Sequence, residues 1–120
     1  MAQPRIYHIC RREEWDAALR VGAYSGSSQD NSDGFIHFST AAQVQESARK
    51  HRAGQMGLVL LTVDAEALGA ALKWEPSRGG ELFPHLYGTL PVAAVLRVDK
   101  LPLGADGTHV FPALAEESEG

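Results

Sequence analysis

The spacing of apolar residues predicts short strands and helices that alternate up to residue 57, followed by a region richer in strands. Alternating or continuous apolar runs predict strands or extended segments at 5–10, 34–39, 58–63, 73–76, 93–98 and 110–112. Apolar residues three and four positions apart predict helices at 11–21 and 41–52, and Asp64 as an N-cap predicts a short helix at 65–72. This mixture favours an α+β fold.

The segment 34–40 is the most unusual part of this pattern, because it carries a histidine in the middle of a predicted strand. Period-two alternation places Ile36 and Phe38 on one face of the strand and His37 on the other, together with Phe35 and Ser39. A histidine that lies between two aromatic residues and precedes two hydroxyl groups is a candidate functional residue.

Two stretches beside this strand carry capping and turn chemistry. Thr40 is the expected N-cap of the next helix, because Gln43 three residues later completes a capping box. Before the strand, the polar stretch from Tyr24 to Asp33 has turn residues throughout and no periodicity. We expect a loop that is mobile without ligand and that covers a cleft near His37 when a ligand binds.

The length of 120 residues suits one domain with one core, and an apolar content of 44% is ordinary for a globular protein. No apolar run approaches the roughly 20 residues that span a bilayer. The N-terminus lacks the apolar core of a signal peptide, and Cys10 is the only cysteine. These features favour a cytoplasmic protein with no membrane partner. A net charge of −4 argues against a large nucleic-acid partner, which usually needs a basic face.

Polar residues in strand-like settings are the candidates for chemistry. His8, His37 and His85 each lie in an aromatic, strand-like segment, whereas the other two histidines lie in polar contexts. Glu81 and Tyr87 flank His85 in a segment that is otherwise apolar. Taken one at a time, such residues are more often half-buried side chains with satisfied hydrogen bonds. Their coincidence in one short chain indicates a site.

Other classes of site have less support. The three strand histidines could supply the imidazoles of a catalytic zinc site, but no His-x-x-x-His or His-x-His spacing is present, and we expect no bound metal. A serine hydrolase is disfavoured because the Gly-x-Ser-x-Gly pattern is absent around Ser39. The glycines at 79–80 do not form a phosphate-binding loop.

Several segments together carry a family resemblance: Ile6-Tyr7-His8, Trp15, Gly22, Gly34 to Thr40, Leu58 to Asp64 and Phe83 to Gly88. Over the stretch from Arg5 to about Pro112, the chain resembles a bacterial family known as domain of unknown function 952. That family resembles the ADP-ribosyltransferase superfamily. The order of segments is also similar to that of the catalytic lobe of RNA 2′-phosphotransferases.

The resemblance implies a single α+β domain at 1–113, with an ADP-ribosyltransferase-like split β-sheet and flanking helices, followed by an acidic disordered tail at 114–120. Its cleft would bind NAD or an ADP-ribosylated group. By the match to the family motifs, His8 would hydrogen-bond the ribose near the nicotinamide and His37 would take the second motif position. The third position, often Glu, would fall between Glu81 and His85.

Breaking the bond between nicotinamide and ribose builds positive charge on the sugar, which a nearby carboxylate stabilises. By this match Glu81 is the candidate carboxylate, and His37 and His85 are the other candidate catalytic residues. Stacking rings and groups that bind ribose or phosphate would complete the site: Tyr7, His8, Tyr24, Ser39, Thr40 and Tyr87.

We therefore expect the protein to bind NAD, or an ADP-ribose-type nucleotide, in a cleft lined by His8 and His37. NAD would be a substrate, and cleavage of its glycosidic bond or transfer to an acceptor is left open. Two alternatives remain. One is a non-catalytic module that binds a nucleotide-like small molecule, and the other is a metal-dependent hydrolase that uses His8, His37 and His85.

Overall fold

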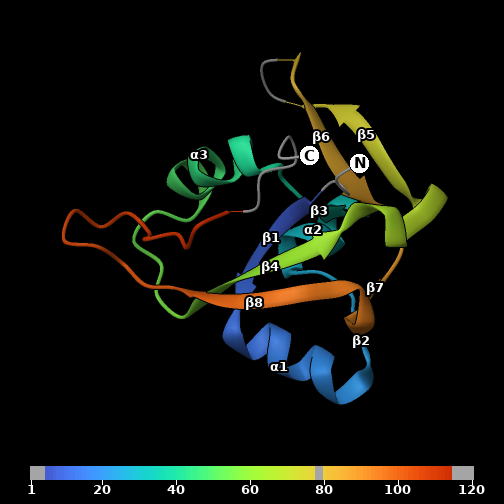
Figure 1. Ribbon diagram of the computed structural model, residues 1–120, viewed down its shortest axis with the longest axis horizontal. Helices are drawn as coiled ribbons and strands as arrows, with labels where there is room; N and C mark the ends of the chain where they lie inside the picture. Colours follow the sequence, from blue (N-terminus) through green and yellow to red (C-terminus); the bar gives the residue numbers. More distant parts are fainter. Residues whose placement is uncertain (1–4, 78–79, 115–120) are drawn as a thin grey trace.

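The chain folds into a mixed α+β arrangement of small antiparallel sheets and helices (Figure 1). The computed structural model describes residues 5–77 and 80–114. Its strands are β1 (Arg5–Arg11), β2 (Ala23–Tyr24), β3 (Ile36–His37), β4 (Leu58–Asp64), β5 (Leu72–Pro76), β6 (Leu82–Leu86), β7 (Leu90–Pro91) and β8 (Val95–Leu101). Its helices are α1 (Arg12–Val21), α2 (Ser28–Asp33) and α3 (Ala41–His51), with 3₁₀ helices η1 (Ala65–Ala71) and η3 (Val92–Ala94).

Strand β4 is the centre of the main sheet, whose antiparallel order is β1-β4-β8. Its run from Leu58 to Val63 is buried along its whole length. A strand with neighbours on both edges and packed side chains on both faces meets water nowhere, which explains why the run is nearly all apolar. The prediction of a central strand buried on both faces is confirmed.

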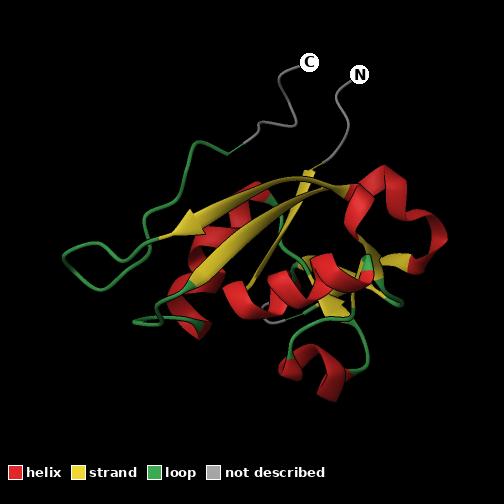
Figure 2. Ribbon diagram, turned by 90° about the horizontal axis from the view of Figure 1, so that it is seen from below, coloured by secondary structure: helices red, strands yellow, loops and turns green. Residues whose placement is uncertain are grey.

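Helices α1 and α3 pack on opposite faces of this sheet. Side chains alternate along β1, so Ile6 and Cys10 pack with Trp15 of α1, whereas Tyr7 packs with Val44 of α3. Seen from below, α1 lies across the long strands (Figure 2). Both helix predictions are confirmed to within one residue at each end.

The second sheet has the order β3-β6-β5 and carries most of the candidate site. In its register His85 of β6 lies between His37 of β3 and Lys73 of β5. A backbone bridge joins this sheet to the main one, because Tyr7 and Ser39 exchange two hydrogen bonds of 2.8 Å. A third, two-stranded sheet pairs β2 with β7.

Some boundaries differ from the expectations. The strand expected at 34–39 forms a ladder only at Ile36–His37, with Ser39 in a separate bridge to Tyr7. Strand β8 begins two residues later than expected because η3 precedes it. The edge segment expected at 110–112 is not a strand, and Leu103 instead forms an isolated bridge with His109. The expected tail lies almost wholly outside the described residues. None of the described helices is long and apolar enough to cross a membrane.

The polar stretch before β3 forms helix α2, so the expectation of an irregular loop is wrong for residues 28–33. Ser27 is the N-cap. Its amide donates a 2.8 Å hydrogen bond to Oδ2 of Asp30, and the Asp30 amide donates to the Ser27 hydroxyl at 3.3 Å. This reciprocal pair is a capping box with Asp in the position usually taken by Glu or Gln. Gly34 ends the helix in the left-handed conformation, with φ at 89°.

Replacing Gly26 with Ala should destabilise the protein more than replacing Gly34 with Ala. Both glycines have a positive φ, +98° and +89°, so each substitution meets the strain of left-handed backbone, roughly 1–2 kcal/mol. Only at Gly26 would the new Cβ also collide, at 2.8 Å from Cβ of Asp30. Urea denaturation of the two variants measures the difference, and equal losses would show that the turn next to Asp30 adapts without cost.

Candidate functional site

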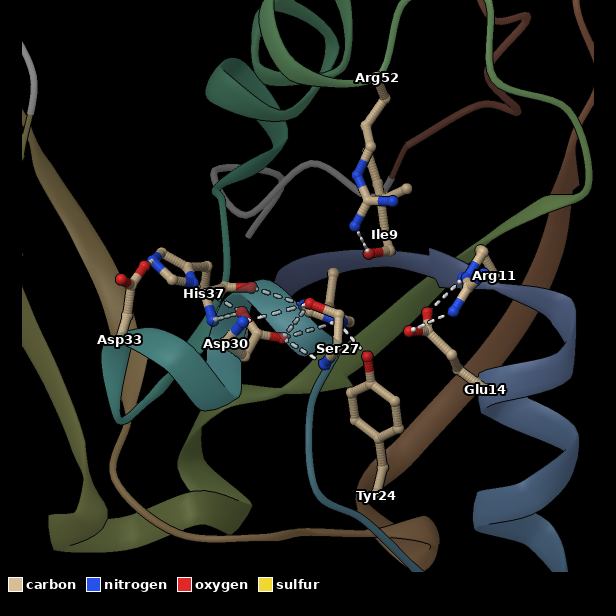
Figure 3. A network of polar contacts seen from close by, with 10 residues as sticks. Ile9, Arg11, Glu14, Tyr24, Ser27, Asp30, Asp33, His37 and Arg52 are labelled. Atoms are coloured by element: carbon tan, nitrogen blue, oxygen red, sulfur yellow. Dashed lines mark hydrogen bonds and ion pairs between the residues drawn. The ribbon is translucent and has the colours of Figure 1, made fainter.

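The buried carboxylate of Asp30 joins α2 to β3 (Figure 3). Its Oδ2 accepts hydrogen bonds from the amide and the hydroxyl of Ser27, at 2.8 and 3.1 Å. Its Oδ1 accepts from the amide of His37 at 3.1 Å and lies 2.6 Å from Nδ1 of the His37 ring. These contacts fix both the backbone and the ring of His37 relative to α2.

Burial alone would raise the pKa of Asp30, but the hydrogen bonds from His37 and Ser27 outweigh it and lower this pKa from 3.8 to about 2. The carboxylate is therefore ionised at neutral pH, although only 3% of the residue is exposed. Such a group is tolerated in the interior only when it is well bonded. Among the described residues, no buried side-chain nitrogen or oxygen lacks a hydrogen-bond partner.

His8 lies next to His37 and is buried in the core, with 3% of its surface exposed. Its Nδ1 donates to the backbone carbonyl of His37 at 2.6 Å, and its Nε2 accepts from the hydroxyl of Tyr24 at 2.7 Å. Burial lowers the pKa of His8, against the opposing effect of the Asp30 carboxylate, and keeps the ring neutral. Both ring nitrogens are thus used within the protein, and the expected hydrogen bond to a ribose would require one of them to be released.

Tyr24 and Cys10 complete this inner layer. Burial raises the pKa of the Tyr24 hydroxyl. It also raises the pKa of the Cys10 thiol to about 12. Neither group ionises at neutral pH, so neither supplies a nucleophile. Tyr24 was expected to stack on a ligand, but its ring is too deeply buried to do so.

Four rings form a cluster on the outer face of the β3-β6-β5 sheet, and this ring cluster consists of Phe35, His37, His85 and Tyr87. Phe35 stacks on His85, with ring centroids 4.2 Å apart and an angle of 28° between the planes. Phe35 also lies 4.6 Å from His37 and 5.2 Å from Tyr87. The rings of His37 and His85 are 5.5 Å apart because the two residues are directly paired across β3 and β6.

Glu75 of β5 is the carboxylate that is hydrogen-bonded to the ring cluster. Its Oε1 accepts hydrogen bonds from Nδ1 of His85 at 2.7 Å and from the hydroxyl of Tyr87 at 2.8 Å. These two hydrogen bonds lower the pKa of Glu75, and the same carboxylate raises the pKa of Tyr87. The side chain of Glu75 is 35% exposed, so its charge can be reached from solvent.

The ring cluster is only partly covered. The side chain of His37 is 39% exposed, and Oδ2 of Asp33, from a side chain that is 37% exposed, lies 3.0 Å from its Nε2. Tyr87 is also exposed, whereas the His85 side chain is only 8% exposed. A surface of rings bordered by carboxylates can stack a planar group and attract positive charge.

The residues expected to form one site separate into two layers. His37, His85 and Tyr87 meet in the ring cluster, and His8 and Tyr24 lie in the inner layer. His8 and His37 were expected to line one cleft side by side. The structure instead places them one behind the other, joined through the His37 carbonyl and the Asp30 carboxylate.

Three further candidates lie outside both layers. Tyr7 is 1% exposed and packs on the α3 side of the main sheet, so its ring cannot stack on a ligand. Ser39 is buried, bridged to Tyr7 through the backbone. Thr40 begins α3, and its amide donates to the Gln43 side chain at 3.0 Å, which confirms the predicted capping box.

Glu81 is not the carboxylate of the ring cluster. It is exposed just before β6, four residues from His85 in a strand that rises about 3.3 Å per residue. The carboxylates that sequence reasoning missed are Glu75 and Asp30. The spacing Ser27-x-x-Asp30 is a capping-box pattern that could have located Asp30. No local pattern pairs Glu75 with His85, because that pairing depends on the register of β5 on β6.

No three His, Cys, Asp or Glu side chains gather to hold a metal ion within residues 5–77 and 80–114. His8 has both ring nitrogens in hydrogen bonds inside the protein, so it does not converge with His37 and His85 on one point as a zinc site requires. This geometry gives the metal-dependent hydrolase no support.

Replacing Asp30 with Asn should cost about 2 kcal/mol of unfolding free energy at neutral pH, as a pKa lowered from 3.8 to about 2 implies. The folded protein releases this proton more readily than the unfolded chain, so the contribution is complete above about pH 4 and is lost as the pH falls toward 2. Denaturation at several pH values measures it. Asp16→Asn is the control, because Asp16 makes only an exposed ion pair with Arg12. A parent that loses no more stability in acid than Asp30→Asn would contradict the assignment.

The lowered pKa of His8 predicts a second pH dependence. The unfolded chain takes up a proton on this ring below about pH 6.5, and the folded protein resists it, so stability is complete above that pH and declines as the pH falls. His8→Gln should show a shallower decline between about pH 7.5 and 5.5 than the parent, in urea denaturation. His109→Gln is the control, because His109 is only partly buried and its ring hydrogen-bonds the Gln55 carbonyl. Parallel declines in all three proteins would show that His8 is not responsible.

The comparisons with known proteins agree with the family resemblance. A family model described as "Protein of unknown function (DUF952)" matches residues 9–98. The crystal structure of protein CC0527 from Caulobacter crescentus is similar, with a TM-score of 0.86 and 54% identity over 88% of this chain and 93% of that chain. Its solution NMR structure gives a TM-score of 0.78 and 55% identity over 87% of this chain and 90% of that chain. No curated protein matches. Since the family model spans most of its length, the chain belongs to the DUF952 family.

Proposed function

We propose that this protein binds NAD, or an ADP-ribose-type nucleotide, against the ring cluster on the outer face of the β3-β6-β5 sheet. The observation that carries the proposal is a stack of rings left partly open to solvent, in which Phe35 lies 4.2 Å from His85 and Tyr87 is 41% exposed. Contiguous rings at a surface are typical of sites that bind planar ligands.

The charges around the ring cluster favour a planar group that carries positive charge. Glu75 lies at one border of the cluster, and Asp33 lies beside His37 at the other. The nicotinamide ring of NAD is planar and cationic, so it would gain both stacking and attraction to these carboxylates. The same carboxylates would stabilise the positive charge that develops on the ribose when its bond to nicotinamide breaks.

The arrangement of strands supports an ADP-ribosyltransferase-like fold, with the split lying between the β1-β4-β8 and β3-β6-β5 sheets. The residues at the three motif positions, His8, His37 and His85, come from β1, β3 and β6 and are in contact in that order. In this assignment His85, hydrogen-bonded to Glu75, takes the third position in place of Glu81. His8 then holds the backbone of His37 instead of binding the ribose.

A non-catalytic nucleotide-binding module is the second candidate function. The observation that favours it is that the carboxylates at the cluster already have partners within the protein. Glu75 accepts from His85 and Tyr87, and Asp33 pairs with His37. Carboxylates held in this way would attract a cationic ring without taking part in bond cleavage.

Thermal unfolding with and without NAD tests the proposal. NAD in excess of its dissociation constant should raise the Tm of the parent, because a ligand that binds only the folded protein stabilises it. Tyr87→Leu should lose most of this shift. Trp74→Leu is the matched control, since Trp74 is 43% exposed against 41% for Tyr87 but lies on the opposite face of the hairpin.

Measuring released nicotinamide in the same mixtures separates the two candidates. A Tm shift with release of nicotinamide supports an enzyme, and a shift without release supports the binding module. The absence of any shift with NAD or ADP-ribose would overturn the proposal. An equal loss of the shift in Tyr87→Leu and Trp74→Leu would overturn the placement of the ligand at the ring cluster.

A further inference from the structure

We propose that His85 is the proton acceptor for a hydroxyl group or water molecule bound at the ring cluster, with Glu75 as its positioning residue. The identity of the substrate rests on the function proposed above, whereas the state of the His85 ring does not. In this arrangement the oxygen nucleophile approaches His85 from the side of Nε2.

The hydrogen bond to Glu75 fixes which nitrogen of His85 carries the hydrogen. Oε1 of Glu75 lies 2.7 Å from Nδ1 of His85. The hydrogen bonds it accepts lower the pKa of Glu75, so this carboxylate is ionised and can only accept. Nδ1 must then be the donor, and a neutral His85 ring keeps its lone pair on Nε2.

Nε2 of His85 is the one imidazole nitrogen of the three strand histidines that no described residue engages. His8 uses both of its nitrogens for the His37 carbonyl and Tyr24, and His37 uses both of its own for Asp30 and Asp33. No nitrogen or oxygen that lacks a partner is shut away from solvent among the described residues, so Nε2 of His85 opens to the surface. It is therefore free to accept a proton from a ligand.

Neighbouring side chains fix the orientation of the His85 ring, and therefore the direction in which Nε2 points. Phe35 covers one face of the imidazole as a stacked ring, and the His85 side chain is only 8% exposed. The hydroxyl of Tyr87 donates to the same Glu75 oxygen at 2.8 Å, which fixes the carboxylate in turn. A base whose partner is itself fixed is the arrangement that general base catalysis requires.

The chemical step balances without any further reagent. Nε2 takes the proton of the O–H group as that oxygen forms a bond to C1′ of the ribose. The bond between C1′ and nicotinamide breaks, and its electron pair leaves with neutral nicotinamide. His85 is then an imidazolium that the Glu75 carboxylate stabilises, and it returns the proton to solvent. With water as the nucleophile, the products are ADP-ribose, nicotinamide and one proton.

The tautomer of His85 is measurable in the protein alone. NMR of ¹⁵N-histidine-labelled protein, at a pH where the ring is neutral, should find the hydrogen on Nδ1. Glu75→Ala should shift the population toward the Nε2–H form, because the acceptor at Nδ1 is gone. Tyr87→Phe should keep the parent tautomer, since it leaves the bond between Glu75 and His85 in place. Glu81→Ala is the matched control and should change nothing.

Acylation by diethyl pyrocarbonate provides a second readout, because it requires an accessible, unprotonated imidazole nitrogen. Peptide mapping of the folded parent should show His85 modified before His8 and His37. A parent with the hydrogen on Nε2, or with His85 slower to react than His8, would overturn the proposal. An Nδ1–H tautomer that does not respond to Glu75→Ala would overturn the positioning role.

These readouts separate this proposal from the one on which it rests. The expected tautomer and reactivity together with no Tm shift from NAD would support the proton acceptor and reject NAD as its ligand. Turnover of NAD that is undiminished in Glu75→Gln would reject the proton acceptor and leave nucleotide binding in place. A lower kcat in Glu75→Gln together with the tautomer shift in Glu75→Ala supports both, and a raised KM in Glu75→Gln reports the lost attraction between the Glu75 charge and the cationic ring.

Discussion

The ionised carboxylate of Asp30, buried between α2 and β3, is the constraint on which the candidate site depends. It caps α2 through Ser27 and binds both the amide and the ring of His37. His37 in turn offers its carbonyl to His8. A single charged group therefore connects a short helix, an edge strand and the main sheet, and the cost of its burial is offset by the hydrogen bonds that converge on it.

The number of hydrogen-bond partners gives the same type of side chain different capacities in the two layers. His8 and His85 are both strand histidines with aromatic neighbours, and both have little exposed surface. In His8 the two nitrogens are bonded inside the protein, so the ring serves as a neutral link between strands. In His85 only Nδ1 has a partner among the described residues, and the remaining nitrogen is not shut away from solvent. The difference lies in the number of partners, not in the depth of the ring.

Local patterns in the sequence predicted the elements that local forces form. The i, i+3, i+4 spacing and the Thr40–Gln43 capping box located α1 and α3, and the apolar run identified β4 as central. Helix α2 was missed because its six residues have no apolar face, and its stability comes from a cap whose carboxylate also binds a neighbouring strand.

The site was predictable in its histidines and not in its carboxylates. Their strand-like aromatic settings singled out His37 and His85, but the choice between Glu81 and Glu75 depends on how β5 pairs with β6. A carboxylate next to His85 in sequence lies too far along the strand, whereas one ten residues away lies within 2.7 Å. Register is set by the pairing of whole strands, which single positions do not encode.

The buried thiol of Cys10 is a built-in probe of local opening in the main sheet. It is the only sulfhydryl in the chain, it sits in β1 opposite Val59 of β4, and its raised pKa leaves it protonated and unreactive while the two strands stay paired. A thiol-specific reagent can reach it only during local openings that move α1 off this face of the sheet or separate β1 from β4. The labelling rate of the unmodified protein thus measures how often those openings occur, without an engineered probe.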